Sequence, residues 1–168
     1  MRNSRAGAFF NLKIKTLHQL TRIARALRKR GRRIVFTNGC FDIIHYGHVQ
    51  YLAAAKQKGD VLIVGVNSDA SVRRLKGKPR PFVSQHDRLG IIAALGCVDY
   101  VVVFSQGTPR TLIARLKPHV LVKGADWSVL DIVGAGFVTS YGGRVATIKL
   151  APGRSSTGLI NKIARSIV

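Results

Sequence analysis

The sequence has no glutamate, few cysteines and no long apolar run. All 7 acidic residues among its 168 positions are aspartate, so no glutamate can serve as a catalytic base. The two cysteines, Cys40 and Cys97, form neither a metal-type nor a redox-type pair, which fits a reducing compartment. No apolar stretch reaches the ~18 residues needed to span a bilayer, and Ala8-Phe9-Phe10 is too short for a secretion signal. These absences predict a protein of the cytoplasm that does not insert into a membrane.

Negative charge is scarce as well. The chain has 28 Lys and Arg residues against 7 acidic ones, a formal net charge of +21. Such an excess favours anionic partners, which include nucleotides, sugar phosphates, nucleic acid and an anionic membrane face. A solvated basic surface would account for most of these charges without any partner. The hydrophobic fraction of 46% excludes a disordered chain, and the length fits one domain with a single core.

Apolar runs alternate with helical patterns along the chain. The runs have no polar breaks, which is typical of parallel strands covered on both faces. We therefore expect an α/β fold, a Rossmann-like doubly wound parallel sheet with helices on both faces. A basic leader is expected over residues 1–15 and a single domain over residues 16–168. Strands are expected at 33–37, 60–67, 100–104, 119–122 and 144–150, helices at 16–30, 49–58, 84–95, from 108 and at 156–168, and a basic loop at 73–81.

Two histidines stand where the first strand hands over to a helix. His45 falls in the turn and His48 near the helix start, where backbone N–H groups point at an incoming anion. Gly47 leaves room between them for a triphosphate to approach the backbone. The spacing predicts a nucleotide site in which either imidazole donates hydrogen bonds to phosphate. Two alternatives stay open: a metal bound by both histidines with Asp42, and a purely structural His48.

Several motifs, in order, resemble a known superfamily. The run Phe36–Leu52 resembles the signature of nucleotidyltransferases such as glycerol-phosphate cytidylyltransferase and pantetheine-phosphate adenylyltransferase. A closer likeness, to the heptose 1-phosphate adenylyltransferases, covers nearly all of residues 33–165. In many bacteria that activity belongs to the second half of a protein whose first half is a sugar kinase. This sequence resembles only the second half, so we expect the stand-alone form. The closer likeness is carried by Val66–Ser71, Arg74–Gly77, Arg80-Pro81, Asp87-Arg88, Val98–Val102, Leu121–Trp127 and Ser155–Thr157.

The resemblance implies a reaction and its substrates. ATP and D-glycero-D-manno-heptose 1-phosphate would give ADP-heptose and pyrophosphate, for lipopolysaccharide core or related surface glycans. The attacking oxygen belongs to a phosphate that is already an anion, so the enzyme mainly orients and neutralises. A chain without glutamate can do this. The expected cofactor is Mg²⁺, held mainly by the phosphates, with Asp42 as a candidate ligand.

The resemblance also implies site residues. The catalytic candidates are His45, His48, Lys76 and Arg88; the alternative for Lys76 is plain solvation and for Arg88 an ion pair with an aspartate. Asp42 has three candidate roles: orienting His45, helping to hold Mg²⁺, or capping the turn. Ala125 stands where relatives more often have a second glycine. The expected nucleotide-binding residues are Asn38, Gly39, Cys40, Phe41, Asp42, Gly47, Lys123, Gly124, Asp126, Ser155, Ser156 and Thr157.

Two other functions remain as alternatives. The shared motifs indicate binding of a triphosphate more firmly than they indicate which base it carries. The first alternative is therefore a cytidylyltransferase or another polyol-phosphate nucleotidyltransferase. The second is a nucleic-acid or anionic-surface binding protein that uses the +21 charge. For the enzyme, the expected partners are ATP and a sugar 1-phosphate, with no specific nucleic acid, and a second copy of the chain in a homodimer.

Overall fold

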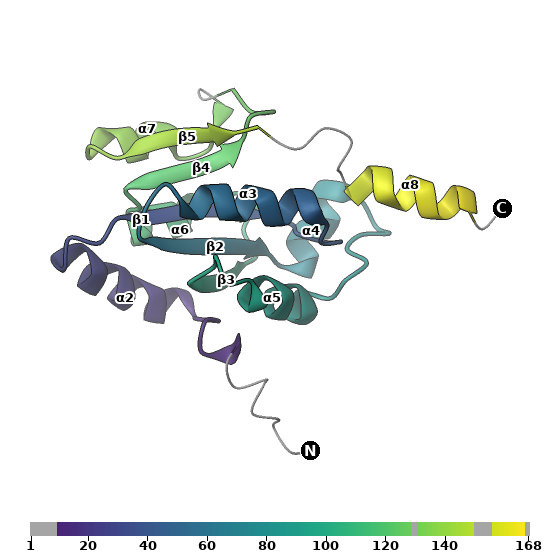
Figure 1. The fold of residues 1–168 in the computed structure, drawn as a ribbon, viewed down its shortest axis with the longest axis horizontal. Helices are drawn as coiled ribbons and strands as arrows, with labels where there is room; N and C mark the ends of the chain where they lie inside the picture. The colour runs from purple at the N-terminus through teal and green to yellow at the C-terminus, as the bar shows by residue number, and fades with distance from the viewer. Residues whose placement is uncertain (1–9, 129–130, 150–155, 167–168) are drawn as a thin grey trace, which may run out of the picture.

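A five-stranded parallel sheet forms the centre of the protein (Figure 1). The structure, a computed structural model, describes residues 10–128, 131–149 and 156–166. The strands lie in the order β3-β2-β1-β4-β5. They are β1 Ile34–Gly39, β2 Val61–Asn67, β3 Tyr100–Phe104, β4 Val120–Gly124 and β5 Arg144–Ile148; the helices are α2 Leu17–Lys29, α3 Tyr46–Lys56, α4 Asp69–Lys76, α5 Gln85–Ala94, α6 Arg110–Leu116, α7 Ala135–Ser140 and α8 Ser156–Ser166.

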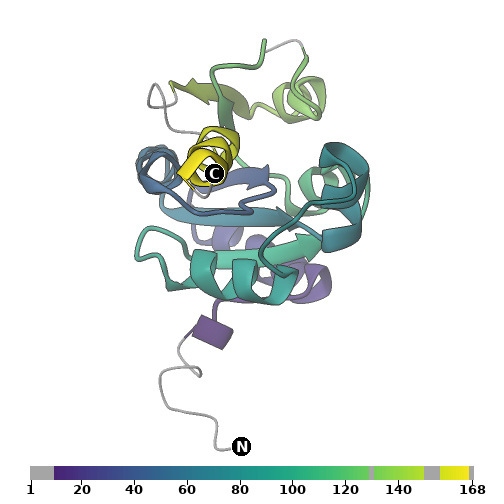
Figure 2. The same ribbon diagram turned by 90° about the vertical axis from the view of Figure 1, so that its right-hand side faces the viewer.

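Helices cover both faces of the sheet (Figure 2). Every residue of β2 is buried, as a strand covered on both sides must be. One core cluster joins the sheet to α3 and α5 through residues such as Leu52 and Ile92. The other joins it to α2, α6 and α7 through Leu20, Ile113 and Val138. The doubly wound α/β fold expected from the sequence is confirmed, and its strand order reverses beside β1, where β4 pairs with it.

Local capping explains where several helices begin. Thr16 accepts a hydrogen bond from the Gln19 N–H and the Gln19 side chain returns one, a capping box that starts α2 as expected. Ser84 caps α5 in the same position that the sequence predicted. In contrast, α3 begins at Tyr46, three residues before the predicted start, so His48 lies inside its first turn.

The expected basic loop was wrong in its first half. Residues 69–76 form α4, capped by the Ser68 side chain, which accepts a hydrogen bond from the Ser71 N–H. Val72 packs into the core from this helix, and Gly77 at a φ of 93° ends it. Ser68 and Asp69 favour the start of a helix, and this preference decides the local structure despite the many positive charges that follow. Helix α7 was not predicted at all; its first-turn glycine and short length hid it.

The described part of the expected leader packs on the edge of the sheet. Ile14 forms a parallel bridge with Val101 of β3, and Lys15 N–H donates to the Val101 carbonyl. The Lys13 ammonium donates to the Leu95 carbonyl at the end of α5. Residues 10–15 therefore cover strand β3, which would otherwise present an open edge.

The helices of the described residues are short. None combines the length and the apolar composition that crossing a bilayer would require.

Candidate functional site

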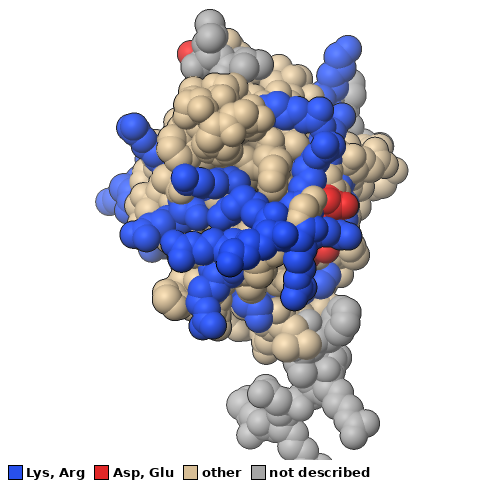
Figure 3. Space-filling view, turned by 90° about the vertical axis from the view of Figure 1, so that its left-hand side faces the viewer, with Lys and Arg blue, Asp and Glu red and all other residues tan. Residues whose placement is uncertain are grey.

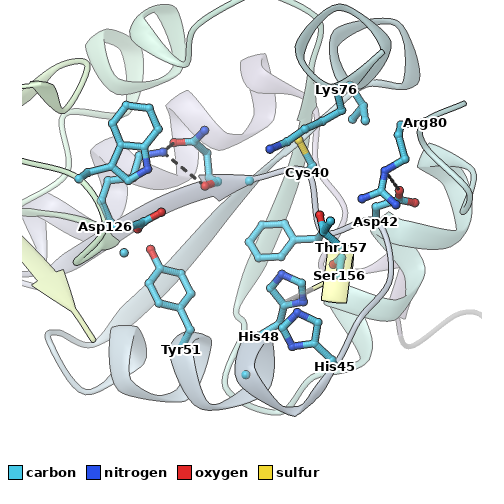
Figure 4. Close-up of a pocket in the computed structure, with 18 residues that line it drawn as sticks. Cys40, Asp42, His45, His48, Tyr51, Lys76, Arg80, Asp126, Ser156 and Thr157 are labelled. Atoms are coloured by element: carbon cyan, nitrogen blue, oxygen red, sulfur yellow. Dashed lines mark hydrogen bonds and ion pairs between the residues drawn. The ribbon is translucent and has the colours of Figure 1, made fainter. Parts of the chain in front are cut away.

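A cavity of about 360 Å³ lies at the carboxyl ends of β1 and β4, where the strand order reverses (Figure 4). Ligands bind at this position in open α/β sheets, because the loops after neighbouring strands diverge there. The walls come from the turn after β1, the first turns of α3, the end of α4, the loop that follows α4, the end of β4 and the start of α8.

The turn after β1 is shaped by Phe41. Its φ of 48° lies in the left-handed region, and its ring is buried with 5% exposure. A Cβ on Gly39 would stand only 3.1 Å from that ring, so glycine lets the turn fold tightly. The ring meets the His48 imidazole edge-on, with centroids 5.4 Å apart. Phe41 therefore packs against the inner ring of the histidine pair, that of His48.

The two imidazoles stack on one another at the start of α3. Their centroids are 3.9 Å apart and the rings are inclined by 24°. His45 is the N-cap residue of α3, but its side chain makes no capping hydrogen bond. Both rings line the cavity, as expected from the sequence. The Nδ1 atom of His48 is buried and has no hydrogen-bond partner among the described residues.

Burial keeps His48 neutral. Desolvation, with a smaller contribution from the neighbouring His45, lowers its pKa to about 4. At pH 7 the ring therefore carries one N–H and no charge. A neutral imidazole donates one hydrogen bond to an incoming phosphate, and a triphosphate would favour its protonation by bringing negative charge close to it.

Two cations approach the histidine pair from the other side. Lys76 ends α4 and its exposed side chain reaches the cavity. Arg80 also lines the cavity; its Nε lies 3.1 Å from Oδ2 of Asp42, and its buried Nη1 has no hydrogen-bond partner among the described residues. The Arg80 guanidinium is held by the Asp42 carboxylate through Nε, so its Nη1 can donate a hydrogen bond to a second anion.

Asp42 faces the loop after α4 instead of His45. Its Oδ1 accepts hydrogen bonds from the backbone N–H groups of Phe82 and Val83, at 2.8 and 2.9 Å, and its Oδ2 meets Arg80. With 3% exposure, this carboxylate has Oδ1 hydrogen-bonded to the loop, whereas the buried Oδ2 is paired with the charge of Arg80 but has no hydrogen-bond partner among the described residues. Of the three roles expected for Asp42, these contacts support the turn-holding one.

Arg88 lies beneath the site and is completely buried. Its guanidinium donates to the carbonyls of Cys40 and Val83 and to Oδ1 of Asp69, at 2.6, 3.0 and 2.7 Å. The ion pair with an aspartate, the structural alternative, is thus present, and Arg88 is not among the residues that line the cavity. It ties the turn after β1 to the start of α4 and to the loop before α5.

The end of β4 supplies the far end of the cavity. Lys123 Nζ lies 2.6 Å from Oδ1 of Asn38, so the two predicted residues form a pair. Burial lowers the pKa of Lys123 to about 8, against the opposing effect of Asp126. Gly124 is buried, and Asp126, labelled in Figure 4, and the half-exposed Trp127 also line the cavity.

Helix α8 begins at the cavity. Ser156 donates a hydrogen bond to the Ile43 carbonyl at 3.1 Å, which ties this helix to the histidine turn. Thr157 follows it in the cavity wall. Ser155, expected beside them, lies outside the described residues. The hydroxyls at the start of a helix are suited to binding phosphate oxygens.

Cys40 lines the cavity with a raised thiol pKa. Burial is the main cause, and the nearby cations Lys76 and Arg88 oppose it. The thiol is therefore protonated at neutral pH, which suits a packing residue better than a nucleophile.

Most of the predicted site residues come together in this one cavity. Their roles remain predictions. The exceptions among the predicted residues are Arg88, which lies below the wall, and Ser155. Those that line it are Asn38, Gly39, Cys40, Phe41, Asp42, His45, Gly47, His48, Lys76, Lys123, Gly124, Asp126, Ser156 and Thr157.

Sequence reasoning missed four lining residues, Tyr51, Val72, Arg80 and Trp127. Tyr51 lies one helical turn after His48, so the 3.6-residue period could have found it. Its hydroxyl lies 2.7 Å from that of Thr37, and burial raises its pKa to about 12. Val72 belongs to α4, the helix that the sequence did not predict, and Arg80 was hidden among neighbouring charges.

The donor set does not suit a protein-bound metal. Within the described ranges, no three His, Cys or Asp residues gather closely enough to hold an ion. Asp42 is taken by Arg80 and the loop, so it does not complete a site with the histidines. A divalent cation would have to take most of its ligands from the substrate's phosphates.

Comparison with known proteins finds relatives that match nearly the whole chain. Bifunctional protein HldE of Geobacter metallireducens is 55% identical over 154 residues, which make up 92% of this chain and 31% of that protein. HldE of Campylobacter concisus is 50% identical over 162 residues, 96% of this chain and 33% of that protein. The chain thus spans about a third of the length of the curated relatives it matches.

Solved structures share the fold. A lipopolysaccharide core biosynthesis protein from Thermoplasma volcanium superposes with a TM-score of 0.60 at 29% identity, over 72% of this chain and 98% of that one. The pantoate-beta-alanine ligase of Francisella tularensis, at 17% identity and a TM-score of 0.58 over 90% of this chain and 78% of that one, shows the fold alone. The cytidylyltransferase-like family model matches residues 36–157, from β1 to the first turn of α8. The chain belongs to the cytidylyltransferase-like family.

Proposed function

We propose that this chain transfers the adenylyl group of ATP to D-glycero-D-manno-heptose 1-phosphate, giving ADP-heptose and pyrophosphate. The observation that carries the proposal is the stacked pair of imidazoles beside two cations, in a cavity at the switch point of the sheet. The identity of about half to the HldE proteins supports the choice of reaction. The likeness to the lipopolysaccharide core biosynthesis protein of Thermoplasma volcanium supports the choice of sugar.

The chemistry is an in-line displacement at phosphorus. An oxygen of the sugar 1-phosphate attacks the α-phosphorus of ATP, the bond from that phosphorus to the bridging oxygen breaks, and pyrophosphate leaves with the electron pair. The nucleophile is already an anion, so no side chain needs to remove a proton from it. The reaction therefore does not require a glutamate as a catalytic base, and the chain has none.

The cavity's two ends suggest how the substrates lie. His45 and His48 would donate hydrogen bonds to the phosphates as negative charge moves onto the leaving group. Lys76 would neutralise charge from the opposite wall, and the hydroxyls of Ser156 and Thr157 would hold the outer phosphates at the start of α8. The nucleoside would then reach toward Lys123 at the end of β4.

Mg²⁺ is proposed as part of the ATP complex. When bound to the phosphates it would neutralise charge on the triphosphate, and the protein residues would orient that complex. The commitment of Asp42 to Arg80 and to the loop supports this division. We further propose that the enzyme works in the cytoplasm and that it forms a homodimer. Light scattering of the purified protein would test the homodimer.

Two measurements test the proposed reaction. Pyrophosphate release with ATP or CTP against a panel of sugar 1-phosphates should be fastest with ATP and the heptose. Faster release with CTP would move the assignment to the cytidylyl donors after which the family is described. No release with any pair would refute nucleotidyl transfer itself. Product masses identify which phosphoanhydride has formed.

A further inference from the structure

Positive charge gathers at the end of the molecule opposite the cavity (Figure 3). Helices α2, α3 and α6 all finish at this end, where the strands of the parallel sheet start. We define the basic face by the cations at these helix ends and strand starts: Arg28, Lys29, Arg30, Arg32, Arg33, Lys56, Lys58, Arg115, Lys117 and Arg144. Figure 3 shows Lys and Arg in a broad band across this end, with acidic atoms only at its margin.

Some of these cations form hydrogen bonds or ion pairs within the protein. Arg28 donates a hydrogen bond to the Leu116 carbonyl at the end of α6, and Lys56 pairs with Asp99. Arg32 lies 3.8 Å from Asp60. A cation in the last turn of a helix also complements the helix dipole, which accounts for about one charge per helix end.

The rest have no such partner. Within the part of the chain that the structure describes, no hydrogen bond or ion pair is recorded for the side chains of Arg30, Arg33, Lys58 and Arg144, and all four are exposed. Lys117 and Arg115 are in the same position. Burial is the main cause of the lowered pKa of His119, and the charges of Arg28 and Arg33 lower that pKa further, against the opposing charge of Asp60. An external anion would relieve the repulsion among the cations of this face.

The surroundings of the basic face limit what that anion can be. Among the described residues, most of the large apolar side chains that are exposed lie elsewhere, for example at Leu75, Phe82 and Trp127 near the cavity and Ile163 on α8. A surface that inserts into a membrane normally carries several Trp, Phe or Leu side chains beside its cations. Near the basic face, Phe137 of α7 is exposed but packs edge-on against Tyr141, and a single ring of this kind disfavours a bilayer as the partner.

The basic face is also poorly suited to recognising the bases of a nucleic acid. Tyr100 and Tyr141, two aromatic residues near these strand starts, are half-buried; the Tyr141 hydroxyl donates to the Pro118 carbonyl, and the exposed Phe137 packs edge-on against the Tyr141 ring. Binding of single strands usually relies on aromatic side chains that stack on bases. Six of the ten cations of the basic face are arginines, whose guanidinium groups bind phosphate oxygens in a bidentate manner.

We propose that the basic face binds the phosphate backbone of a double-stranded nucleic acid, independently of base sequence. The proposal goes beyond nucleotidyl transfer and does not depend on it. The face lies at the amino ends of the strands and the cavity at their carboxyl ends, so a duplex and ATP occupy separate sites. Binding weakens with salt, because each phosphate contact releases condensed cations from the duplex.

The test compares two variants of the full chain with equal loss of charge. The face variant carries Arg30→Gln, Arg33→Gln, Lys58→Gln and Arg144→Gln. The matched control carries Gln at four exposed cations outside the face, Arg110, Lys149, Lys162 and Arg165. A short labelled DNA duplex and the RNA duplex of the same length are titrated by fluorescence anisotropy, between about 50 and 200 mM salt. Thermal unfolding and pyrophosphate release verify that each variant is folded and active.

The face variant should bind duplex at least about tenfold more weakly at low salt, and its slope of log affinity against log salt should fall by about 3. The control should stay within about threefold of the wild type. Saturating ATP should not displace the duplex. Four results would each overturn the proposal: no duplex binding by the wild type, equal weakening of both variants, displacement by ATP, or binding to phosphatidylglycerol vesicles without binding to duplex. Failure of pyrophosphate release alone would refute the proposed reaction and leave the basic face untouched.

Discussion

The two ends of the sheet are both rich in cations but hold them differently. At the carboxyl ends of the strands, Arg80 is held by Asp42, Lys123 by Asn38 and Arg88 by Asp69. At the amino ends, exposed cations such as Arg30 and Lys58 have no recorded partner among the described residues. Most cations at the cavity are held by a neighbouring acceptor, and most of those on the basic face are not. The exceptions are Lys76 at the cavity, which is exposed and has no recorded partner among the described residues, and Arg28, Arg32 and Lys56 on the basic face, which have partners.

The architecture explains this division. Loops after the strands come from different parts of the chain and meet around one cavity, so side chains there can hold each other in place. The opposite end is made of helix C-termini, which favour positive charge without fixing its direction. Fixed charges suit a transition state, while mobile ones suit a repetitive polyanion.

Arg88→Met should have the largest effect, on stability. The substitution leaves the carbonyls of Cys40 and Val83 and the carboxylate of Asp69 without their donor. The free energy of unfolding should fall by about 3 kcal/mol, as measured by urea denaturation.

The matched arginine at the other end is Arg30. Arg30→Met should change the free energy of unfolding by less than about 0.5 kcal/mol, because the side chain is exposed. If Arg88→Met left stability intact and abolished turnover, Arg88 would be a catalytic residue and not the positioning residue that its contacts indicate.

His48→Ala should lower turnover by about 10²-fold or more, roughly 2.7 kcal/mol of barrier, while the protein stays folded. The reason is the loss of a donor that the stack with His45 and the edge of Phe41 hold in place. The control is His86→Ala, whose side chain is 95% exposed on α5. Near-normal turnover of His48→Ala would remove His48 from the mechanism.

Lys76→Ala should raise the KM for ATP by about tenfold, roughly 1.4 kcal/mol, through lost neutralisation of the triphosphate. Lys76 lines the cavity from the end of α4, whereas Lys78, two residues later, does not. Lys78→Ala therefore supplies the control, with both steady-state constants expected to stay within about twofold of the wild type. Equal effects of the two substitutions would mean that the loop acts only through its net charge.

Much of this fold follows from local patterns. The buried runs at β1 and β2, and the caps Thr16 and Ser84, are determined within a few residues of sequence. Helix α4 was missed because the arginines and lysines of its outer face look like loop composition, although Ser68 is an ordinary cap. Solvent tolerates charge on either a helix or a loop, so charge density alone cannot distinguish them.

The site was predictable where its residues are neighbours in sequence. His45 and His48 stack because they share one turn of chain, and the glycine and phenylalanine beside them could be placed with them. The roles of Asp42 and Arg88 could not be settled, because all their hydrogen-bond partners, except Val83 for Arg88, lie 19 to 48 residues away. Which of several carboxylates or carbonyls an arginine reaches depends on tertiary packing.

The smallest expected effect concerns the titration of two histidines, one at each end of the sheet. Burial is the main cause of the lowered pKa in both, but the second cause differs. For His48, with a pKa of about 4, it is the neighbouring imidazole; for His119 it is the charge of Arg28 and Arg33. Both rings are expected to be neutral at pH 7 and to gain a proton as the pH falls, His48 last.

Salt separates the two causes. Added salt screens Arg28 and Arg33, together with the smaller opposing charge of Asp60, so the pKa of His119 should rise by the part of its shift that these charges cause, while the larger part, due to burial, remains. His48 owes its shift mainly to desolvation, which salt does not relieve, so its pKa should stay near 4. Proton NMR titration of the two imidazoles at low and high salt measures both values in one sample. Equal movement of both rings with salt would mean that the positive field extends across the sheet to the cavity, and the contrast between free and fixed cations would then lose its electrostatic basis.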